Sequence, residues 1–327
     1  MFNILFYTNN IIGDIMIIRL GYVAISKTLD ITTSKTITYT NYEKEKDINK
    51  IDTIIKENLN NLEKVIDYNI TNNIHFYRLT SKLIPLATKE DVIFDYIEKY
   101  KKYYDRIAKK IKESNMRVDL HPDQFCVLNS TNKDVIKNTF NILEYHYEIL
   151  NQLNVKNKII ILHIGSSVLG KVNSIKRFIN NFNKLDDKIK KCIVIENDDK
   201  VYNVKDCLEL SKEINVPIVL DYHHHICNGG FDIKEYLIDI FNTWNITPKI
   251  HFSSPKNKTK KDFRTHHDYI DINDFIKFLD IIKDINIDLD IMIEAKEKDE
   301  ALFRLTRLLK YKGYKFIDET TFINKSD

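Results

Sequence analysis

The sequence predicts an α/β fold, a single-domain (β/α)₈ TIM barrel, from three observations. Short apolar runs of strand length alternate eight times with segments whose apolar residues recur at helical spacing. Six of these runs end in histidine, carboxylate or lysine side chains, and no Pro- or Gly-rich linker divides the 327 residues. Repeated βα units require a parallel sheet, and eight of them close most economically into a barrel. A doubly wound open sheet is the alternative, although such a sheet usually has fewer strands.

The predicted strands are short, apolar and rich in β-branched residues, as strands buried on both faces are. The first spans residues 17–25, and the sixth is the run Ile218-Val-Leu220, which stops at Asp221. The other strands are expected at 74–79, 117–120, 158–162, 192–195, 249–252 and 289–293.

The predicted helices separate these strands. A Thr-rich loop over 28–40 precedes a helix over 47–69, in which apolar residues recur at helical spacing. The next helix is expected after Pro85, with an apolar face that runs from Val92 to Ile107. The remaining helices are expected at 135–153, 175–185, 204–214, 233–244, 274–285 and 301–310.

The start of the chain is predicted to be separate from the barrel. Residues 1–15 read as a dispensable extension and residues 16–327 as the barrel domain, because Met16 is a second candidate start. The opening stretch lacks a basic region, and Asn10 and Asp14 interrupt its apolar residues. We therefore expect neither a signal peptide nor a membrane span there.

Composition sets few limits on function. The net charge of +3 arises from 50 basic and 47 acidic residues, so it neither demands nor excludes a nucleic-acid partner. The four cysteines form no C-x-x-C pair, which argues against a disulfide framework and for a reducing compartment. We expect a cytoplasmic protein.

The polar residues that end the strands predict a shared site. In a (β/α)₈ barrel the carboxyl ends of all strands meet at one mouth, where active sites lie. A single histidine could be an ordinary core residue, but six such strand ends are hard to obtain by chance. The residues at these ends are His121, His163, Glu196, Asp221, His224, Lys249, His251 and Glu294, and His266 and His267 follow in the loop after the seventh strand.

The number and chemistry of these side chains predict a metal centre. Three or four imidazoles with three carboxylates exceed what one cation takes, so two or three ions are expected. Nitrogen and oxygen ligands without a thiolate suit Zn²⁺ or Mn²⁺. Closely spaced cations suit in-line phosphodiester hydrolysis, because they stabilise both the attacking and the leaving oxygen. Sugar isomerisation on a two-metal barrel is the rival chemistry.

Nine short stretches resemble the UV damage endonucleases, relatives of the endonuclease IV apurinic-site nucleases. They occur in family order from about residue 19 to about residue 310. The H-P-x-Q-[FY], I-E-N-D-D and K-x-H-x-S-S-P pieces are together highly specific. The stretches are Arg19-Leu-Gly-Tyr-Val23, Phe76-Tyr-Arg-Leu-Thr-Ser81, His121-Pro-Asp-Gln-Phe125, Leu162-His-Ile-Gly165, Ile195-Glu-Asn-Asp-Asp199, Leu220-Asp-Tyr-His-His224, Lys249-Ile-His-Phe-Ser-Ser-Pro255, His266-His-Asp-Tyr-Ile270 and Met292-Ile-Glu-Ala-Lys296.

The resemblance implies an enzyme that cuts the DNA backbone immediately 5′ of a lesion and leaves a 3′-hydroxyl. Family substrates include cyclobutane dimers, 6-4 photoproducts and abasic sites. Lys249 is similar to a lysine that can be carboxylated beside the metals, and it is expected to act in catalysis with Glu196, His251 and Glu294. The implied metal ligands are His121, His163, Glu196, Asp221, His224, His251, His266 and Glu294.

The resemblance also implies residues that contact DNA. Gln124 and Phe125 look like the pair that probes the duplex where damaged nucleotides are flipped out, and an aromatic ring there can replace lost stacking. Tyr22 resembles a tyrosine of the lesion pocket. Lys256 opens a lysine-rich loop after the seventh strand that could neutralise backbone phosphates, although such a run is more often a solvated loop.

Three departures from the family pattern leave details open. His267 stands where the family commonly has Ala or Ser, so either His266 or His267 could be the ligand, and alignment favours His266. Phe125 replaces a tyrosine of some members and keeps the stacking face without the hydroxyl. Tyr22 precedes Val-Ala-Ile-Ser instead of the Pro-Cys-Glu-Asn of some members, which leaves lesion preference open.

The sequence therefore predicts a metal-dependent DNA repair endonuclease whose partner is double-stranded DNA with UV lesions. We expect a monomer with no organic cofactor and no membrane attachment. Two alternatives remain at this point: a sugar isomerase or epimerase of the same barrel type, and a DNA-damage binder that does not cleave.

Overall fold

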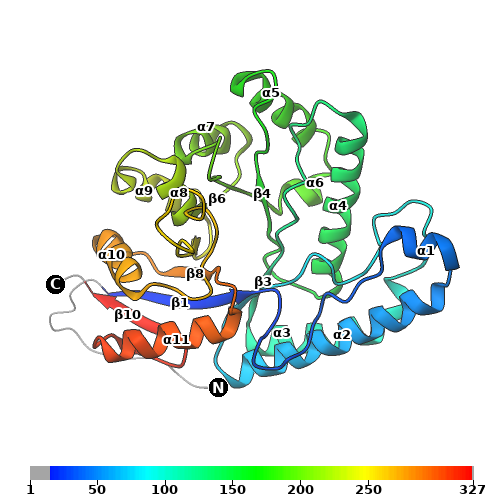
Figure 1. Cartoon of the computed structure of the whole chain (residues 1–327), viewed down its shortest axis with the longest axis horizontal. Coiled ribbons are helices and arrows are strands. Elements are labelled where there is room, and N and C mark those ends of the chain that lie inside the picture. The colour runs from blue at the N-terminus through cyan, green and yellow to red at the C-terminus, as the bar shows by residue number, and fades with distance from the viewer. Residues whose placement is uncertain (1–14, 326–327) are drawn as a thin grey trace.

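Eight parallel strands form a barrel in the computed structural model, which describes residues 15–325 (Figure 1). Neighbouring strands follow the order β3-β2-β1-β8-β7-β6-β5-β4. A parallel bridge between Leu120 and Ile160 joins the two outer strands, and the Ile161 amide donates to the Leu120 carbonyl at 2.9 Å. The predicted (β/α)₈ barrel is confirmed. The strands are β1 (Ile15–Val23), β2 (Phe76–Arg78), β3 (Arg117–Asp119), β4 (Ile160–His163), β5 (Ile193–Glu196), β6 (Ile218–Asp221), β7 (Lys249–Phe252) and β8 (Leu289–Ile293).

Helices follow the strands and cover the outside of the barrel. Side chains cap the starts of several of them, as in α7, where Asn203 and Asp206 make a reciprocal capping box. The apolar stripes of the helices and the outward faces of the strands form the main core. The helices are α1 (Tyr39–Glu45), α2 (Ile48–Thr71), α3 (Lys101–Ser114), α4 (Lys133–Gln152), α5 (Lys171–Phe182), α6 (Asp187–Lys190), α7 (Val204–Ile214), α8 (Tyr222–Asn228), α9 (Leu237–Phe241), α10 (Ile272–Ile282) and α11 (Lys298–Tyr311).

Two predicted helices are shorter than expected. The helix expected after Pro85 begins only at Lys101, after a 3₁₀ turn at Glu98–Tyr100. Asp95 accepts hydrogen bonds from the backbone amides of residues 97 and 98, and this local turn sets the start of the helical segment. Ile93, expected on the apolar face, is 88% exposed. The helix expected at 233–244 is divided into a 3₁₀ turn and the short α9.

Several elements were not predicted, among them the short helices α1 and α6. The three consecutive histidines 223–225 lie in the short helix α8, for which Asp221 provides the N-cap by accepting from the His224 amide. A hairpin of β9 (Lys315–Phe316) and β10 (Thr321–Lys325) pairs antiparallel with the first half of β1. In Figure 1, β10 lies beside β1. Of the predicted extension 1–15, residues 1–14 lie outside the described residues, and Ile15 begins β1.

The interior of the barrel is divided into a polar and an apolar part. Residues two apart on a strand share a face, so charged side chains recur in layers on β3, β7 and β8. Below the mouth, for example, Lys249 of β7 donates to Asp119 of β3 at 2.6 Å. The inner faces of β4, β5 and β6 instead form a small apolar cluster of Ile161, Val194 and Val219. Below the polar residues of the site, the barrel interior is therefore apolar at β4, β5 and β6 and contains ion pairs at β3, β7 and β8.

No helix within residues 15–325 is long and apolar enough to cross a membrane.

Candidate metal centre at the barrel mouth

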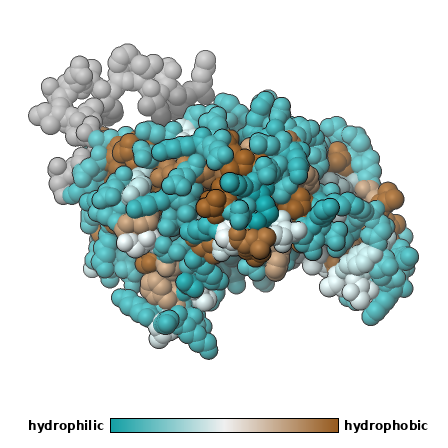
Figure 2. All heavy atoms as spheres, turned by 90° about the horizontal axis from the view of Figure 1, so that it is seen from above, coloured by the Kyte–Doolittle hydropathy of each residue, from teal (hydrophilic) through white to brown (hydrophobic). Residues whose placement is uncertain are grey.

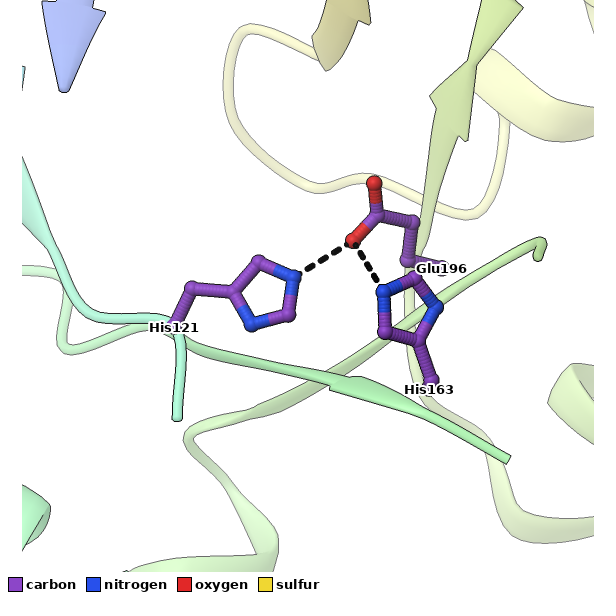
Figure 3. A group of neighbouring side chains, drawn as sticks. All are labelled: His121, His163 and Glu196. Carbon is purple, nitrogen blue, oxygen red and sulfur yellow. Dashed lines mark hydrogen bonds and ion pairs between the residues drawn. The ribbon is translucent and has the colours of Figure 1, made fainter. Parts of the chain in front are cut away.

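Glu196, the last residue of β5, is the centre of the site. Its Oε2 atom lies 2.7 Å from Nε2 of His121 and 3.5 Å from Nε2 of His163 (Figure 3). His163 ends β4, and the strand register places it directly beside Glu196. His121 follows β3, whose end is tied to β4 by the bridge at Leu120. The parallel register therefore gathers two imidazoles around one carboxylate oxygen.

The second oxygen of Glu196 is shared by further side chains. Oε1 lies 2.7 Å from Nδ1 of His251 and 3.9 Å from Nδ1 of His224. The same His251 nitrogen is 3.2 Å from Oε1 of Glu294, and the His224 nitrogen is 3.6 Å from Oδ2 of Asp221. Both oxygens of Glu196 thus connect histidines from four different strand ends.

The side chains form three overlapping groups, in each of which the candidate ligand atoms lie within 4.8 Å of one another. Glu196 belongs to two of the groups and Asp221 to two, so neighbouring ions could share ligands. This arrangement suits two or three closely spaced cations. The groups are His121, His163 and Glu196; Glu196, Asp221 and His224; and Asp221, His251 and Glu294.

Unpaired polar atoms test whether these residues fit a metal. Oδ2 of Asp221, Nδ1 of His163 and Nε2 of His251 are buried and have no hydrogen-bond partner among the described residues. Buried polar atoms are normally paired, so such a concentration indicates a missing ligand. The donors are imidazole nitrogens and carboxylate oxygens, which suit Mn²⁺ or Zn²⁺. The residues present therefore fit divalent cations.

Backbone carbonyls fix the orientation of two of the imidazoles. Nδ1 of His121 donates to the Pro122 carbonyl at 2.9 Å, and Nδ1 of His224 donates to the Asn197 carbonyl at 3.0 Å. A proton held at Nδ1 leaves the lone pair of Nε2 available for a cation. When each ring is neutral, this hydrogen bond favours the tautomer that a metal ligand needs.

The charges of the site favour cations. Burial raises the pKa of Glu196, but the imidazoles of His251, His163 and His121 together lower it well below its ordinary value. Burial likewise raises the pKa of Glu294, and Arg78 and His251 lower it further than burial raises it. Both groups are therefore anionic at neutral pH, although they are buried. Such a site is stabilised when cations bind.

His224 carries a proton when no cation is bound. Burial lowers its pKa, but the carboxylates of Asp221 and Glu196 outweigh burial and raise the pKa to about 9. A cation that binds at His224 must therefore displace a proton.

The predicted ligand His266 lies at the edge of this cluster. Its Nδ1 atom is 3.9 Å from Oε2 of Glu294. The neighbouring His267 is exposed, and its Nδ1 accepts a hydrogen bond from the Tyr269 amide at 2.9 Å. The geometry therefore favours His266 over His267 as a ligand.

Two predicted lysines lie outside the ligand cluster. Nζ of Lys249 is fully buried and 2.6 Å from Oδ2 of Asp119, one layer below His251. Burial lowers the pKa of Lys249 to about 8, although Asp119 raises it. Lys256 lies in the loop after β7, where its side chain is about half exposed at 49%.

Gln124 and Phe125 lie exposed in the loop after β3, and Phe125 is 69% exposed. Both line a groove of about 760 Å³ that also reaches His163 and His224. This position fits the predicted role of a probe beside the metal centre.

Tyr22 lies in a different environment from the one predicted. Its side chain is fully buried between the barrel and α2, and its hydroxyl donates to Oδ1 of Asn69 at 2.8 Å. Arg19 faces the barrel interior, where it contacts Asp290. Successive residues of a strand face opposite sides, and Tyr22 is an odd number of positions after Arg19, so Tyr22 faces outward. The tyrosine has no surface to offer a lesion, so the structure does not support the predicted contact.

Two residues that organise the site were not among those predicted from the strand ends. Arg78, the last residue of β2, places Nη1 2.6 Å from Oε1 of Glu294. Asn197 accepts from the Asp221 amide at 2.9 Å and donates to its carbonyl at 3.0 Å. Arg78 carries the same signal as the predicted residues, a charged side chain at the end of an apolar run. Asn197 follows Glu196 directly and carries no comparable signal.

Fold and site together define a (β/α)₈-barrel protein with a candidate multinuclear metal centre at the carboxyl ends of its strands. The family model of UV-endonuclease UvdE matches residues 18–323. The chain belongs to this family. It is therefore a DNA repair endonuclease, an enzyme of the hydrolase class, and the predicted family resemblance is confirmed.

Individual relatives agree with this assignment. The chain is 40% identical over 299 residues to a UV DNA damage endonuclease of Bacillus cereus (strain G9842), an alignment that covers 89% of this chain and 94% of the relative. The crystal structure of SacUVDE has a TM-score of 0.82 at 31% identity and covers 90% of this chain and 99% of that one. Endonuclease IV from Thermus thermophilus shares the fold, with a TM-score of 0.56 at 10% identity over 90% of this chain and 99% of that one.

Proposed function

We propose that this protein incises DNA immediately 5′ of UV photoproducts and of abasic sites, leaves a 3′-hydroxyl, and requires two or three divalent metal ions. The observation that carries the proposal is the Glu196 carboxylate, whose two oxygens face four histidines from separate strand ends. Buried acids surrounded by imidazoles, with unpaired polar atoms among them, have no evident structural use in this barrel. They have a direct use in a metallohydrolase.

The residues that would hold the ions are the three overlapping groups around Glu196 and Asp221, with His266 as a further ligand beside Glu294. Mn²⁺ or Zn²⁺ bound there would neutralise charge on the phosphate oxygens and lower the pKa of water. Arg78 holds Glu294 in place through a 2.6 Å ion pair. Asn197 holds both Asp221 and His224 by hydrogen bonds, so the ligands are oriented before a cation binds.

The exposed residues of the mouth would bind and distort the DNA. Phe125, with Gln124, would occupy the gap left by nucleotides that leave the stack, because an exposed aromatic ring can replace a lost stacking partner. Lys256 and the basic residues that follow it would lie against backbone phosphates. His163 and His224 line the same groove as Phe125, so a distorted strand could reach the metal centre.

Lys249 is proposed to be carboxylated in the active enzyme. Its lowered pKa, about 8, makes the neutral amine accessible near physiological pH, and the neutral amine is the form that reacts with carbon dioxide. The ion pair with Asp119 is the arrangement of the unmodified side chain. Catalytic roles for Glu196, Lys249, His251 and Glu294 belong to the same proposal.

The cellular setting is part of the proposal. The partner is double-stranded DNA that carries UV lesions, the enzyme acts as a monomer without an organic cofactor, and it works in the cytoplasm on chromosomal DNA. The absence of a C-x-x-C pair among the four cysteines agrees with a reducing compartment.

A nicking assay tests the proposal. A labelled duplex with one thymine dimer is incubated with the protein and Mn²⁺, and a parallel reaction receives EDTA. We expect one nick directly 5′ of the dimer, with a 3′-hydroxyl that a polymerase can extend, and no nick with EDTA. A specific complex that stays intact with every divalent metal would instead support a non-cleaving binder, and cleavage on the 3′ side would refute the proposed position.

A further inference from the structure

Three exposed apolar side chains beside the mouth have no role in the proposed function so far. Val168 and Leu169 lie in the loop between β4 and α5, and Val172 lies in the first turn of α5. Their exposed fractions are 51%, 71% and 67%. We refer to Val168, Leu169 and Val172 as the apolar ridge. Figure 2 shows a largely hydrophilic surface on the side to which α5 projects in Figure 1, and clustered apolar residues on such a surface usually mark a contact site.

Side chains of α5 donate hydrogen bonds to the backbone carbonyls of the ridge. Ser174 and Arg177 both donate to the Val168 carbonyl, the former at 2.9 Å. Asn173 donates to the Leu169 carbonyl at 2.9 Å. The hydrogen bonds hold the ridge in one conformation before anything binds.

The residues before the ridge are equally constrained. Gly165 has φ +109°, and a Cβ atom there would lie 2.4 Å from Oδ1 of Asn129. Only glycine allows the loop to approach this closely. The Ser166 carbonyl then accepts from Nδ2 of Asn129 at 2.6 Å and from the Tyr202 hydroxyl at 3.1 Å. The path from β4 to the ridge is therefore as rigid as the ridge itself.

Leu169 has a backbone conformation that leucine rarely adopts. Its φ is +64°, in the left-handed region that side chains with a Cβ atom rarely adopt. Its side chain gains no burial in return.

The ridge adjoins the groove that leads to the metal centre. Val168 lines this groove together with Phe125 and Val127, and His163 and His224 of the metal centre line it too. Its polar lining is mixed, because Lys200 lines it beside Asp134, Asp198 and Asp199, and Asp199 pairs with Lys200 and Arg264. The apolar side chains of the groove offer the surface that suits the faces of bases.

We propose that the apolar ridge is a second base-contacting element, which packs against unstacked bases of the distorted duplex while Phe125 fills the gap in the stack. The inference rests on the proposed function. It makes Val168 and Leu169 specificity-determining residues: they stabilise the complex only when bases are unstacked, so they favour damaged over intact DNA. They contact no phosphate, so they do not change how binding depends on salt.

The test compares Val168→Ser/Leu169→Asn with wild type. Asparagine tolerates the left-handed backbone, so the double variant removes apolar surface without adding strain. The measurements are the dissociation constants for a dimer-containing and an intact duplex over a range of salt. We expect the ratio of the two constants to fall about tenfold, with an unchanged salt slope. Thermal unfolding should be unchanged or slightly improved.

Two controls separate the explanations. Ile317→Ser removes an exposed apolar side chain (56% exposed) in the turn between β9 and β10, far along the chain from the mouth loops, and should leave the ratio unchanged. Lys256→Ala should lower the salt slope but not the ratio. An unchanged ratio in the double variant would overturn the inference, as would an equal loss for both duplexes. If the wild type itself fails to nick dimer DNA, the proposed function is rejected, and this result is distinct from a failure of the ridge inference.

Discussion

The two ends of the barrel both bury carboxylates, but they neutralise them in different ways. At the amino end, Asp290 accepts from Arg19 at 2.6 and 2.7 Å and from Arg117 at 2.7 Å. Guanidinium groups are always charged, so this carboxylate is fully compensated within the protein. At the mouth, Glu196 and Asp221 face mainly imidazoles, and Oδ2 of Asp221 has no hydrogen-bond partner among the described residues.

This difference shows how a structural ion pair can be told from a ligand site. An imidazole can exchange its proton for a cation, as His224 must, so a cluster of acids and histidines can take up metal ions in place of protons. Arginines pair with acids directly. The mouth contains one arginine in this role, Arg78, which pairs with Glu294 and leaves Glu196 to the histidines. At the amino end both carboxylate oxygens of Asp290 are paired with guanidinium groups, although Nε and Nη2 of Arg117 have no hydrogen-bond partner among the described residues. At the mouth it is a carboxylate oxygen and two imidazole nitrogens, which are ligand atoms for a cation, that have none.

The largest expected effect comes from Glu196→Gln at the mouth. The amide keeps the shape but removes the negative charge that two ligand groups share, so nicking should fall by at least about a thousandfold, the equivalent of several kcal/mol. Circular dichroism and gel filtration should show an unchanged fold. Nicking at the wild-type rate would contradict the ligand assignment.

Asp290→Asn at the amino end should lower stability and leave the nicking activity unchanged, the opposite of Glu196→Gln. The change leaves two guanidinium groups without their shared carboxylate, and breaking a buried pair costs about 3–5 kcal/mol. Urea unfolding should show this loss of stability. The nicking rate of the folded fraction should stay near that of the wild type, and a variant that is stable but inactive would break the distinction between the two ends.

A rise in pH should lower the stability of the metal-free protein and raise the affinity of the mouth for Mn²⁺. The folded pKa of His224, about 9, lies above its ordinary value of 6.5. The stability that the protonated ring contributes is thus fully present below pH 6.5 and lost as pH rises through 9. Metal binding must displace this proton, so Mn²⁺ affinity should rise about tenfold per pH unit below 9.

Calorimetric titration with Mn²⁺ at several pH values, together with unfolding of the metal-free protein, measures both effects. A Mn²⁺ affinity that does not change between about pH 6.5 and about pH 8.5 would show that His224 binds no metal. His224→Gln should remove both trends and provides the matched control.

The smallest expected effect comes from Phe125→Ala, which lies at the mouth but outside the ligand cluster. The loss of one stacking surface should weaken discrimination of damaged from intact DNA about tenfold. Mn²⁺ binding should not change, since Phe125 contacts none of the ligands named above. Equal discrimination in a filter-binding assay would remove Phe125 from the probing role.

The fold could be predicted because its signals are local. Apolar runs of strand length and helical stripes alternate so regularly that the predicted strands and helices differ mainly at their boundaries, and the largest difference, at residues 85–100, comes from a side-chain turn at Asp95. The β9–β10 hairpin was not predicted because its strands are short. Lys315 begins β9 and Lys325 ends β10, so neither strand forms a long apolar run. Its pairing partner lies at the opposite end of the chain, which no local pattern reveals.

The candidate site was predictable to the extent that strand ends converge. His121, Glu196 and Asp221 could be placed together because parallel strands end at one mouth. Tyr22 could not be placed by motif, because alternation along β1 decides its direction. The partner of Lys249, Asp119, also escaped prediction, since it depends on which layer of the interior each strand contributes.

The pairing of β10 with β1 brings the described ends of the chain together, with Ile15 opposite Lys325 at the amino end of the barrel. A short engineered linker between these positions would give a circularly permuted enzyme whose new ends could be opened in any outer loop. If the enzyme were immobilised on a surface through a residue near Lys325, the amino end of the barrel would face the surface. The mouth would then stay accessible to long DNA.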